Sequence, residues 1–265
     1  MSSIAVNGAD IYYELRGAGP PVMFISGATG DAGHFERVAD LLADEFTVLT
    51  YDRRGNSRSP CPDGWETTSV AEQVDDAAAL LSGLGLAPAA VYGNSYGAIF
   101  ALDLLLRRPG VVRSAVLHEP PMISVLDDPV AAQASVGAAV QEGMAQGGPP
   151  GAVDRFFRLA VGDETWDRLP TGLRDRMTSN GETLVGMELG TFESYRPDDS
   201  ALAGITTPAH VLVSEDSPGF FHEVAAWLAA RAGVEVVRTP GSHTPQFDHP
   251  DELVRTIRPL LRGRT

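Results

Sequence analysis

The sequence contains a single cysteine, Cys61. An internal disulfide is therefore excluded, and with it the disulfide framework that stabilises many small secreted proteins. Cys61 lies in the Pro-rich stretch SPCPDG, whose neighbours offer no group that would activate a thiol. We interpret it as an incidental loop thiol without a catalytic role.

Long apolar runs are also absent. No stretch approaches the roughly 18 apolar residues that span a bilayer, and residues 1–20 lack the basic start and apolar centre of a secretory signal peptide. We therefore expect a soluble, cytoplasmic protein.

Basic residues are too few to balance the acidic ones. Lys and Arg total 20 whereas Asp and Glu total 35, so the formal net charge is −15 and the pI is near 4.7. Such a chain repels phosphate backbones and anionic lipid surfaces, which makes nucleic acid and membrane poor candidates as partners. The expected partner is a small-molecule substrate, and the composition leaves open whether the protein is a monomer or a homo-oligomer.

What the sequence does contain is a regular alternation of short β-rich runs with longer helical patterns. With 265 residues, 43% of them hydrophobic, the chain can bury one substantial core. The alternation predicts an α/β fold: a mostly parallel sheet flanked by helices, preceded by a hairpin whose turn is Asn7-Gly8. The predicted parallel strands are residues 21–25, 46–51, 89–92, 111–118, 209–214 and 234–238.

The pattern changes between residues 120 and 199. Helical fragments there are interrupted by QGGPPG, LPTG and RPDD, and no convincing buried strand occurs. We predict a core domain made of residues 1–119 and 200–265, with residues 120–199 inserted into it as a helical cap.

Gly93-Asn94-Ser95-Tyr96-Gly97 has the G-x-S-x-G pattern of a nucleophile turn. It follows the predicted strand AAVY and precedes the helical pattern AIFALDLLL. A sharp strand-to-helix turn leaves no room for a side chain two residues before or after the serine. It also exposes the hydroxyl at the carboxyl edge of the sheet, above a helix N-terminus that favours negative charge. In this context the motif predicts Ser95 as the attacking nucleophile; the alternative is an ordinary Gly-rich turn.

The general base must be one of the 6 histidines. Where the nucleophile lies on such a turn, the base follows the last strand of the sheet. His243 meets this requirement, because it lies in TPGSHTPQFDHP between the predicted strand VEVVR and the final helical pattern. His249 is the nearest rival, but it abuts Pro250 and Asp251 at a helix start, where a surface or capping role is favoured.

A carboxylate must hold the imidazole of His243 in the tautomer that accepts a proton. It usually follows the strand after the cap, but in the stretch SEDS the expected position holds Ser217, and Asp216 comes one residue early. The other possible place is the end of the strand after the nucleophile, where Glu119 stands in VLHEPP. We prefer Glu119 and keep Asp216 as the alternative acid. Glu119 could instead only bond nearby backbone amides.

Acyl transfer also needs hydrogen-bond donors for the oxygen that becomes charged. One is predicted to be the backbone amide of Tyr96, which follows the nucleophile. The second should come from the loop after the strand VMFI, with Gly27 or Ala28 as candidates. Ser26 stands where this kind of loop often has histidine.

Several segments together resemble the α/β-hydrolase superfamily over essentially the whole chain outside the cap. They are YYE…GPPV, SGATG, YDRRGNSRS, GNSYG, LHEPP and PGSHTPQFDHPDE. The resemblance implies the α/β-hydrolase fold, with substrate choice residing in the cap.

The position of Glu119 resembles the acid placement of haloalkane dehalogenases and of fungal zearalenone-type lactone hydrolases. In the latter, a His-Glu-x-Pro segment and a Pro-Gly-x-His-x-Pro…His-Pro-Asp segment are similar to residues 118–121 and 240–251 here. Dehalogenases and epoxide hydrolases use aspartate as nucleophile, so Ser95 separates this chain from both. The lactonase resemblance implies a triad of Ser95, Glu119 and His243. It does not extend to zearalenone as substrate, because the aromatic residue expected near SNGETLVGM is missing.

These observations predict a serine hydrolase that cleaves an ester or lactone of a neutral or apolar small molecule through an acyl-enzyme on Ser95, without a metal or organic cofactor. The substrate is expected to bind between sheet and cap. The cap residues expected to contact it are Met144, Phe156, Phe157, Trp166 and Met187. Each of them could instead pack the cap's own core.

Other classes remain open. A thioesterase or a C–C hydrolase would use the same residues on a different substrate. An aminopeptidase would need cap carboxylates, for which Glu164, Glu182 and Glu188 are candidates. A ligand-binding protein of hydrolase ancestry, with little turnover, would retain the same triad.

Overall fold

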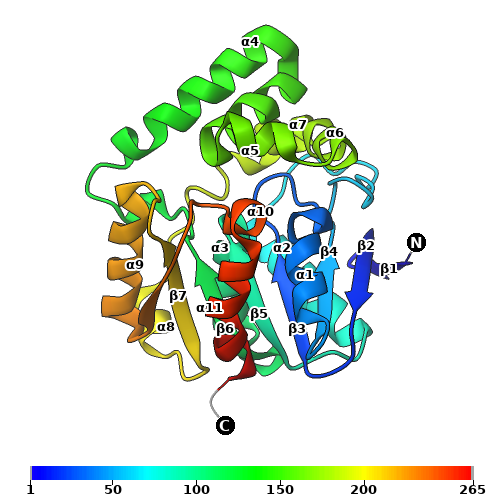
Figure 1. Cartoon of the computed structure of the whole chain (residues 1–265), viewed down its shortest axis with the longest axis vertical. Helices are drawn as coiled ribbons and strands as arrows, with labels where there is room; N and C mark the ends of the chain where they lie inside the picture. Colours follow the sequence, from blue (N-terminus) through cyan, green and yellow to red (C-terminus); the bar gives the residue numbers. More distant parts are fainter. Residues whose placement is uncertain (1, 264–265) are drawn as a thin grey trace.

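The protein is built around one eight-stranded sheet with the strand order β1-β2-β4-β3-β5-β6-β7-β8 (Figure 1). The computed structural model describes residues 2–263. The strands are β1 (Ser2–Val6), β2 (Ala9–Arg16), β3 (Pro21–Ile25), β4 (Thr47–Tyr51), β5 (Ala89–Asn94), β6 (Val112–His118), β7 (Ala209–Ser214) and β8 (Glu235–Thr239). β2 pairs antiparallel with both β1 and β4, and the other pairs are parallel. The predicted α/β fold with its mostly parallel sheet is confirmed. So is the N-terminal hairpin, where Asn7 and Gly8 have positive φ.

Side chains that alternate along the central strands build an apolar layer on each face of the sheet. In β3, Met23 and Ile25 belong to one core cluster, whereas Val22 and Phe24 belong to the other. A strand buried on both faces has no polar side, which is why these strands are near-continuous apolar runs in the sequence.

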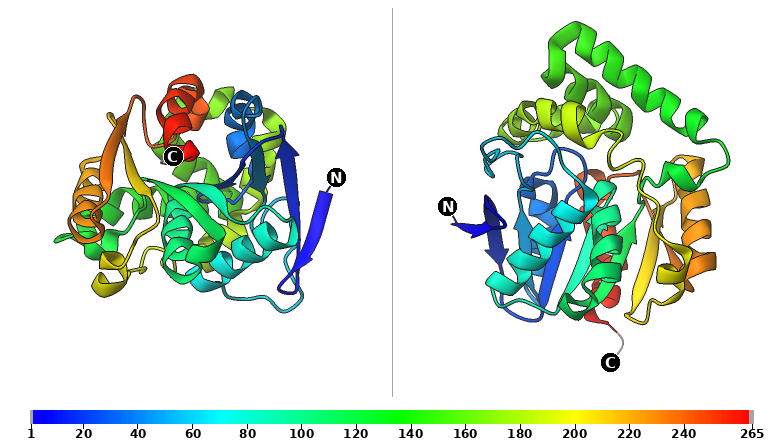
Figure 2. Two further views of the ribbon diagram at one scale, coloured as in Figure 1. Left: turned by 90° about the horizontal axis from the view of Figure 1, so that it is seen from below. Right: turned by 180° about the vertical axis from the view of Figure 1, so that it is seen from behind.

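Helices cover both of these layers. α1 (Glu36–Leu42) and α11 (Pro250–Arg262) pack over Val22 and Phe24, in front of the sheet in Figure 1. α2 (Val70–Gly83), α3 (Tyr96–Arg107) and α9 (Gly219–Ala232) pack on the opposite face, which Figure 2 shows from behind. The shorter helices are η1 (Ala32–Phe35), η2 (Pro109–Val111), η3 (Ile123–Val125), α8 (Asp199–Ala203) and α10 (Pro245–Asp248). Across residues 2–263, none of the helices has both the length and the apolar character that a membrane crossing requires.

Between β6 and β7 the chain forms a layer of helices above one edge of the sheet (Figure 1). We call residues 120–199 the cap segment. Its main helices are α4 (Pro129–Val161), α5 (Asp163–Arg168), α6 (Thr171–Ser179) and α7 (Gly181–Thr183), followed by the wider turn η4 (Leu184–Glu188). The predicted break at QGGPPG appears as a kink within α4, because Gly147 and Gly148 have non-helical backbone angles. The division into two domains stays a prediction.

The parallel strands carry the candidate site residues to the edge beneath the cap segment. The loops that follow β3, β5, β6 and β8 begin at the same edge, since parallel strands end together. These loops contain Gly27, Ser95, Glu119 and His243 respectively. Residues far apart in the sequence are thus brought together by strand order alone.

Candidate active site

Ser95 lies on the sharp turn between β5 and α3. Its φ of 57° and ψ of −127° are unusual for a residue with a side chain. A methyl group on Gly93 would lie 2.0 Å from the carbonyl oxygen of Gly97, and one on Gly97 would lie 2.0 Å from that of Ile25. Both positions therefore require glycine. The Ser95 N–H donates to the carbonyl oxygen of His118 at 2.9 Å, which fixes the turn against β6.

His243 and Glu119 are joined by a short hydrogen bond. His243 Nδ1 lies 2.5 Å from Glu119 Oε2, although the two residues are 124 positions apart. The imidazole also stacks on the ring of Phe221, with 4.4 Å between centroids and 14° between planes. One edge of the ring is thus held by a carboxylate and one face by an aromatic side chain.

Glu119 is fully buried and makes a second bond. Its Oε1 accepts the backbone N–H of Ser214 at 2.6 Å, and its own N–H donates to Leu212 at 3.1 Å. Its φ of 50° turns the side chain away from the line of β6. The carboxylate thus binds both a backbone amide and the imidazole of His243, so it does not bond backbone amides alone.

The protonation states of this pair follow from its contacts. Burial raises the pKa of Glu119, but hydrogen bonds from His243 and Ser214 and the charge of nearby imidazoles outweigh burial and lower it below its ordinary value. The carboxylate is therefore ionised near neutral pH and can only accept hydrogen bonds. His243 Nδ1 must then carry a proton, which leaves Nε2 as the basic nitrogen.

The alternative acid, Asp216, lies elsewhere. Its side chain is exposed, and its backbone N–H donates to the carbonyl oxygen of Gly241 at 3.1 Å. Within the described chain, its carboxylate makes no hydrogen bond or ion pair with His243. Asp216 comes one residue before the position expected for the acid, and its side chain accordingly points to solvent. His249, the rival base, pairs with Asp248 at 3.0 Å and is half exposed.

Ser95 and His243 line the same small cavity. The cavity holds about 20 Å³, roughly room for one water molecule. Within residues 2–263, no hydrogen bond joins the Ser95 hydroxyl to the imidazole in this arrangement. Such contacts commonly tighten only in the complex with substrate. The cavity is far smaller than a typical ligand pocket of roughly 300–1,000 Å³.

The residues predicted as oxyanion donors are Gly27, Ala28 and Tyr96, and Tyr96 directly follows Ser95 in the sequence. A methyl group on Gly27 would lie 2.9 Å from Ser95 Cβ and 3.4 Å from its hydroxyl oxygen, so the Gly27 backbone is in close contact with the serine. Ala28 lines the cavity, and Tyr96 begins α3. Among the residues described, the backbone N–H groups of Ala28 and Tyr96 have no hydrogen-bond acceptor. Both N–H groups are therefore free to donate to another acceptor.

Of the five cap residues expected to contact substrate, only Phe156 and Phe157 line the cavity. Met144 is 38% exposed on α4, and Met187 is half-buried and away from the cavity wall. Trp166 is buried against Phe157, with ring centroids 5.3 Å apart, and its indole N–H donates to Asp154. It packs the core of the cap segment itself. Contact of Met144, Trp166 and Met187 with substrate is therefore not supported by this arrangement.

The cap carboxylates considered for an aminopeptidase do not form a site. Glu188 is fully buried and paired with Arg53 at 2.7 Å. Glu164 and Glu182 are exposed. Since none of the three lines the cavity at Ser95, they offer no binding site for a substrate amine there.

His118 is a supporting residue that the sequence reasoning missed. Its Nδ1 lies 2.5 Å from the hydroxyl of Tyr92, and its Nε2 lies 2.9 Å from the hydroxyl of Ser214, the residue whose amide binds Glu119. Burial lowers the pKa of His118 to about 4, so this imidazole is neutral at pH 7. The available signal was its position directly before Glu119 at the end of a buried strand.

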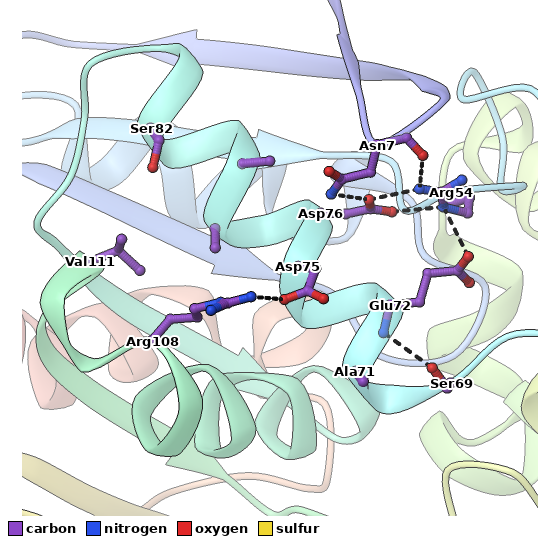
Figure 3. Close-up of a pocket in the computed structure, with 12 residues that line it drawn as sticks. Asn7, Arg54, Ser69, Ala71, Glu72, Asp75, Asp76, Ser82, Arg108 and Val111 are labelled. Carbon is purple, nitrogen blue, oxygen red and sulfur yellow. Dashed lines mark hydrogen bonds and ion pairs between the residues drawn. The ribbon is translucent and has the colours of Figure 1, made fainter.

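A larger hollow, of about 710 Å³, lies along α2, away from these residues (Figure 3). Its charged side chains are already paired with one another. Arg54 binds Asp76 at 2.7 Å, and Arg108 binds Asp75 at 2.9 Å. Nothing in this hollow resembles a set of reacting groups. Nor, in the part of the chain that the structure describes, do three or more His, Cys, Asp or Glu side chains gather as metal ligands.

Comparison with known proteins gives a consistent picture. The alpha/beta hydrolase family model matches residues 22–256. Uncharacterized hydrolase YraK of Bacillus subtilis is 34% identical over 98% of this chain and 95% of that protein. Zearalenone hydrolase of Bionectria ochroleuca is 25% identical over 95% of this chain and 93% of that protein. The enol-lactonase from Burkholderia xenovorans LB400 superimposes with a TM-score of 0.77 at 20% identity, covering 99% of this chain and 100% of that one. A family match over most of the chain, together with the Bacillus relative, shows that this protein is a hydrolase of the α/β-hydrolase family.

Proposed function

We propose that the protein is a serine hydrolase that cleaves an ester or a lactone of a small neutral or apolar molecule. The observation that carries the proposal is the buried Glu119–His243 pair, which lies at the cavity that also contains Ser95. An ionised carboxylate on Nδ1 sets His243 in the tautomer whose Nε2 can take a proton from a hydroxyl. A histidine with only a structural role would not require a buried carboxylate on Nδ1 next to a serine on a strained turn.

The proposed reaction begins with attack of Ser95 on the substrate carbonyl. As the new bond forms between Oγ and the carbonyl carbon, His243 Nε2 takes the hydroxyl proton, and the electron pair of the C=O bond moves onto oxygen. In this proposal the amides of Tyr96 and of Ala28 or Gly27 stabilise that oxyanion, and the support for it is that the N–H groups of Ala28 and Tyr96 have no other acceptor among the described residues. When the tetrahedral species collapses, the C–O bond of the ester breaks, and the leaving alkoxide receives the proton from Nε2.

Water completes the proposed cycle. His243 takes a proton from the water molecule as it attacks the acyl-enzyme carbonyl, and on collapse Ser95 Oγ leaves and recovers a proton from Nε2. For a lactone the released alcohol stays attached to the acyl group, so the product is a single hydroxy acid. The step needs no group beyond water and the residues named.

The wall of the cavity supports an apolar substrate. Phe156, Phe157, Ala160 and Phe247 contribute apolar surface close to Ser95. Among the described residues, no lysine or arginine lines this cavity, so an anionic substrate would find no permanent positive charge there. The names zearalenone hydrolase and enol-lactonase, which belong to similar proteins, are consistent with a lactone.

A panel of neutral esters and lactones tests this function. We expect the wild-type protein to hydrolyse at least one of them, and Ser95→Ala to lose turnover while it still binds the substrate. Tight binding of panel members with negligible turnover by the wild type would instead favour a ligand-binding protein. Equal turnover by wild type and Ser95→Ala would contradict the assignment of the nucleophile.

A further inference from the structure

Arg53 is a buried charged residue that the proposed reaction does not use. It lies in the loop after β4, and its side chain has no exposed surface. Its guanidinium lies over the ring of Phe100, 5.2 Å from the centroid. An arginine withdrawn this completely from water requires strong partners, because removing its charge from water is unfavourable.

The first partner of Arg53 comes from the cap segment. Glu188 is equally buried and binds the guanidinium through both carboxylate oxygens, from Nη1 at 2.7 Å and from Nη2 at 2.9 Å. This is the two-pronged geometry in which an arginine fork fits a carboxylate best. Asn56 Nδ2 donates to the same carboxylate at 3.3 Å. The pair fastens the cap segment to the loop after β4.

The second partner of Arg53 is the loop beside Ser95. Nη2 also donates to the carbonyl oxygen of Gly27 at 2.9 Å, and the Gly30 N–H donates to the same oxygen at 3.2 Å. One guanidinium thus bridges the cap carboxylate and the loop that follows β3.

The bond to Gly27 fixes the direction of a candidate oxyanion donor. The carbonyl of Gly27 and the N–H of Ala28 belong to one planar trans peptide group, so they point in opposite directions. Holding the carbonyl toward Arg53 therefore holds the Ala28 N–H away from Arg53. Ala28 and Ser95 line the same cavity. A positive charge on the carbonyl also polarises the peptide group and strengthens its N–H as a donor.

We infer that Arg53 is a positioning residue for the oxyanion hole and that Glu188 makes this positioning depend on the seated cap segment. The inference rests on the proposed function, since it assumes that Ala28 donates to a developing oxyanion. With the cap segment in place, Glu188 fixes the guanidinium, the guanidinium fixes the Gly27–Ala28 peptide, and the donor is set before reaction. Displacement of Glu188 would remove the two-pronged contact and leave Gln73, 3.2 Å from Nη1, as the remaining side-chain acceptor of the guanidinium.

The apolar double variant Arg53→Met/Glu188→Met separates this role from a merely structural one. Replacing both charges leaves neither one buried alone, and such replacements often keep or raise stability. A structural role therefore predicts that the double variant keeps its thermal melting temperature and its kcat. A positioning role predicts that the double variant keeps its melting temperature and KM, whereas kcat falls by about 10- to 100-fold. This fall is smaller than the roughly 10²–10³-fold loss of rate caused by complete removal of one oxyanion donor.

Two further variants complete the experiment. Glu188→Gln keeps the size of the side chain and should also lower kcat at nearly constant KM, so it serves if the double variant does not fold. Arg176→Lys is the matched control. It weakens a different cap-to-core ion pair, Arg176–Asp31 at 2.7 Å, which does not contact Gly27, and kcat should not change.

The outcomes distinguish the two proposals. If the wild type neither hydrolyses the panel nor reacts at Ser95 with a fluorophosphonate, the proposed function is wrong, and this inference falls with it. If the wild type does both and the folded double variant, or Glu188→Gln, keeps the wild-type kcat, the function stands and the role of Arg53 is overturned. An equal loss of kcat in Arg176→Lys would also overturn it, because general loosening of the cap segment would then explain the effect.

Discussion

Replacement of Glu119 by glutamine tests the proposed triad at the contact between Glu119 Oε2 and His243 Nδ1. Glutamine has the same shape, so no cavity forms, and its amide oxygen can still accept the Ser214 N–H that Oε1 now accepts at 2.6 Å. The amide NH₂ then faces His243 Nδ1, where a carboxylate oxygen lies at 2.5 Å. Two donors cannot share that contact. The ring must place its proton on Nε2, and a protonated Nε2 cannot accept the proton of Ser95.

The expected loss follows from this change of tautomer. The equivalent substitution in a serine-protease triad lowers kcat by about 10⁴, and we expect a fall on the order of 10³–10⁴ here, or about 4–5.5 kcal/mol of transition-state stabilisation. The assay is steady-state hydrolysis of the best ester or lactone, with thermal melting to verify folding. Asp216→Asn is the control and should leave kcat unchanged, because Asp216 is exposed. A Glu119→Gln enzyme that keeps kcat within about threefold, or a large loss in Asp216→Asn, would refute the reasoning.

Three other outcomes are expected. His118 has a pKa of about 4 in the folded protein, against 6.5 in the unfolded chain. As the pH falls, the unfolded chain therefore binds this proton first. The free energy of unfolding should drop by about 2 kcal/mol between pH 7 and 5 because of this one residue. Urea unfolding at both pH values should show a smaller drop for His118→Asn, and an unchanged drop would contradict the cause. Phe156 lies at the cavity wall, so Phe156→Ala should raise KM. Trp166 lies in the core of the cap segment, so Trp166→Phe should lower the melting temperature and leave KM unchanged. The reverse pattern would mean that the roles of these two side chains are misassigned. Alkylation of the exposed Cys61 should not affect turnover, and inactivation that parallels alkylation would give this thiol a role.

Local sequence patterns were enough to predict most of the fold and the sharp turn at Ser95. The central strands are apolar on both faces, so they stand out in the sequence as continuous apolar runs. Gly93 and Gly97 must be glycine, because a Cβ at either position would lie 2.0 Å from a backbone oxygen. The hairpin turn at Asn7-Gly8 depends in the same way on the residues of the turn itself. Features whose physical cause lies within a few neighbouring residues can be predicted from those residues.

The features that stayed open or escaped prediction depend on contacts between distant segments. The sequence favoured Glu119 but left Asp216 as an alternative acid, because the choice depends on how β6, β7 and the loop after β8 lie in space. The same holds for the pair of Arg53 and Glu188, which are 135 positions apart and read separately as ordinary loop and cap charges. In the cap segment, helical spacing cannot distinguish the side of α5 that packs inward from a side that faces substrate, so both substrate contact and core packing stayed open for Trp166.

Reaction with a fluorophosphonate, followed by mass mapping of the modified peptide, tests the central claim most directly. A hydroxyl activated by His243 attacks phosphorus, so the account predicts one adduct on the peptide that contains Ser95, formed rapidly by the wild type, slowly by His243→Ala and not at all by Ser95→Ala. An adduct on another residue, or a wild-type protein that does not react and yet hydrolyses esters, would contradict it.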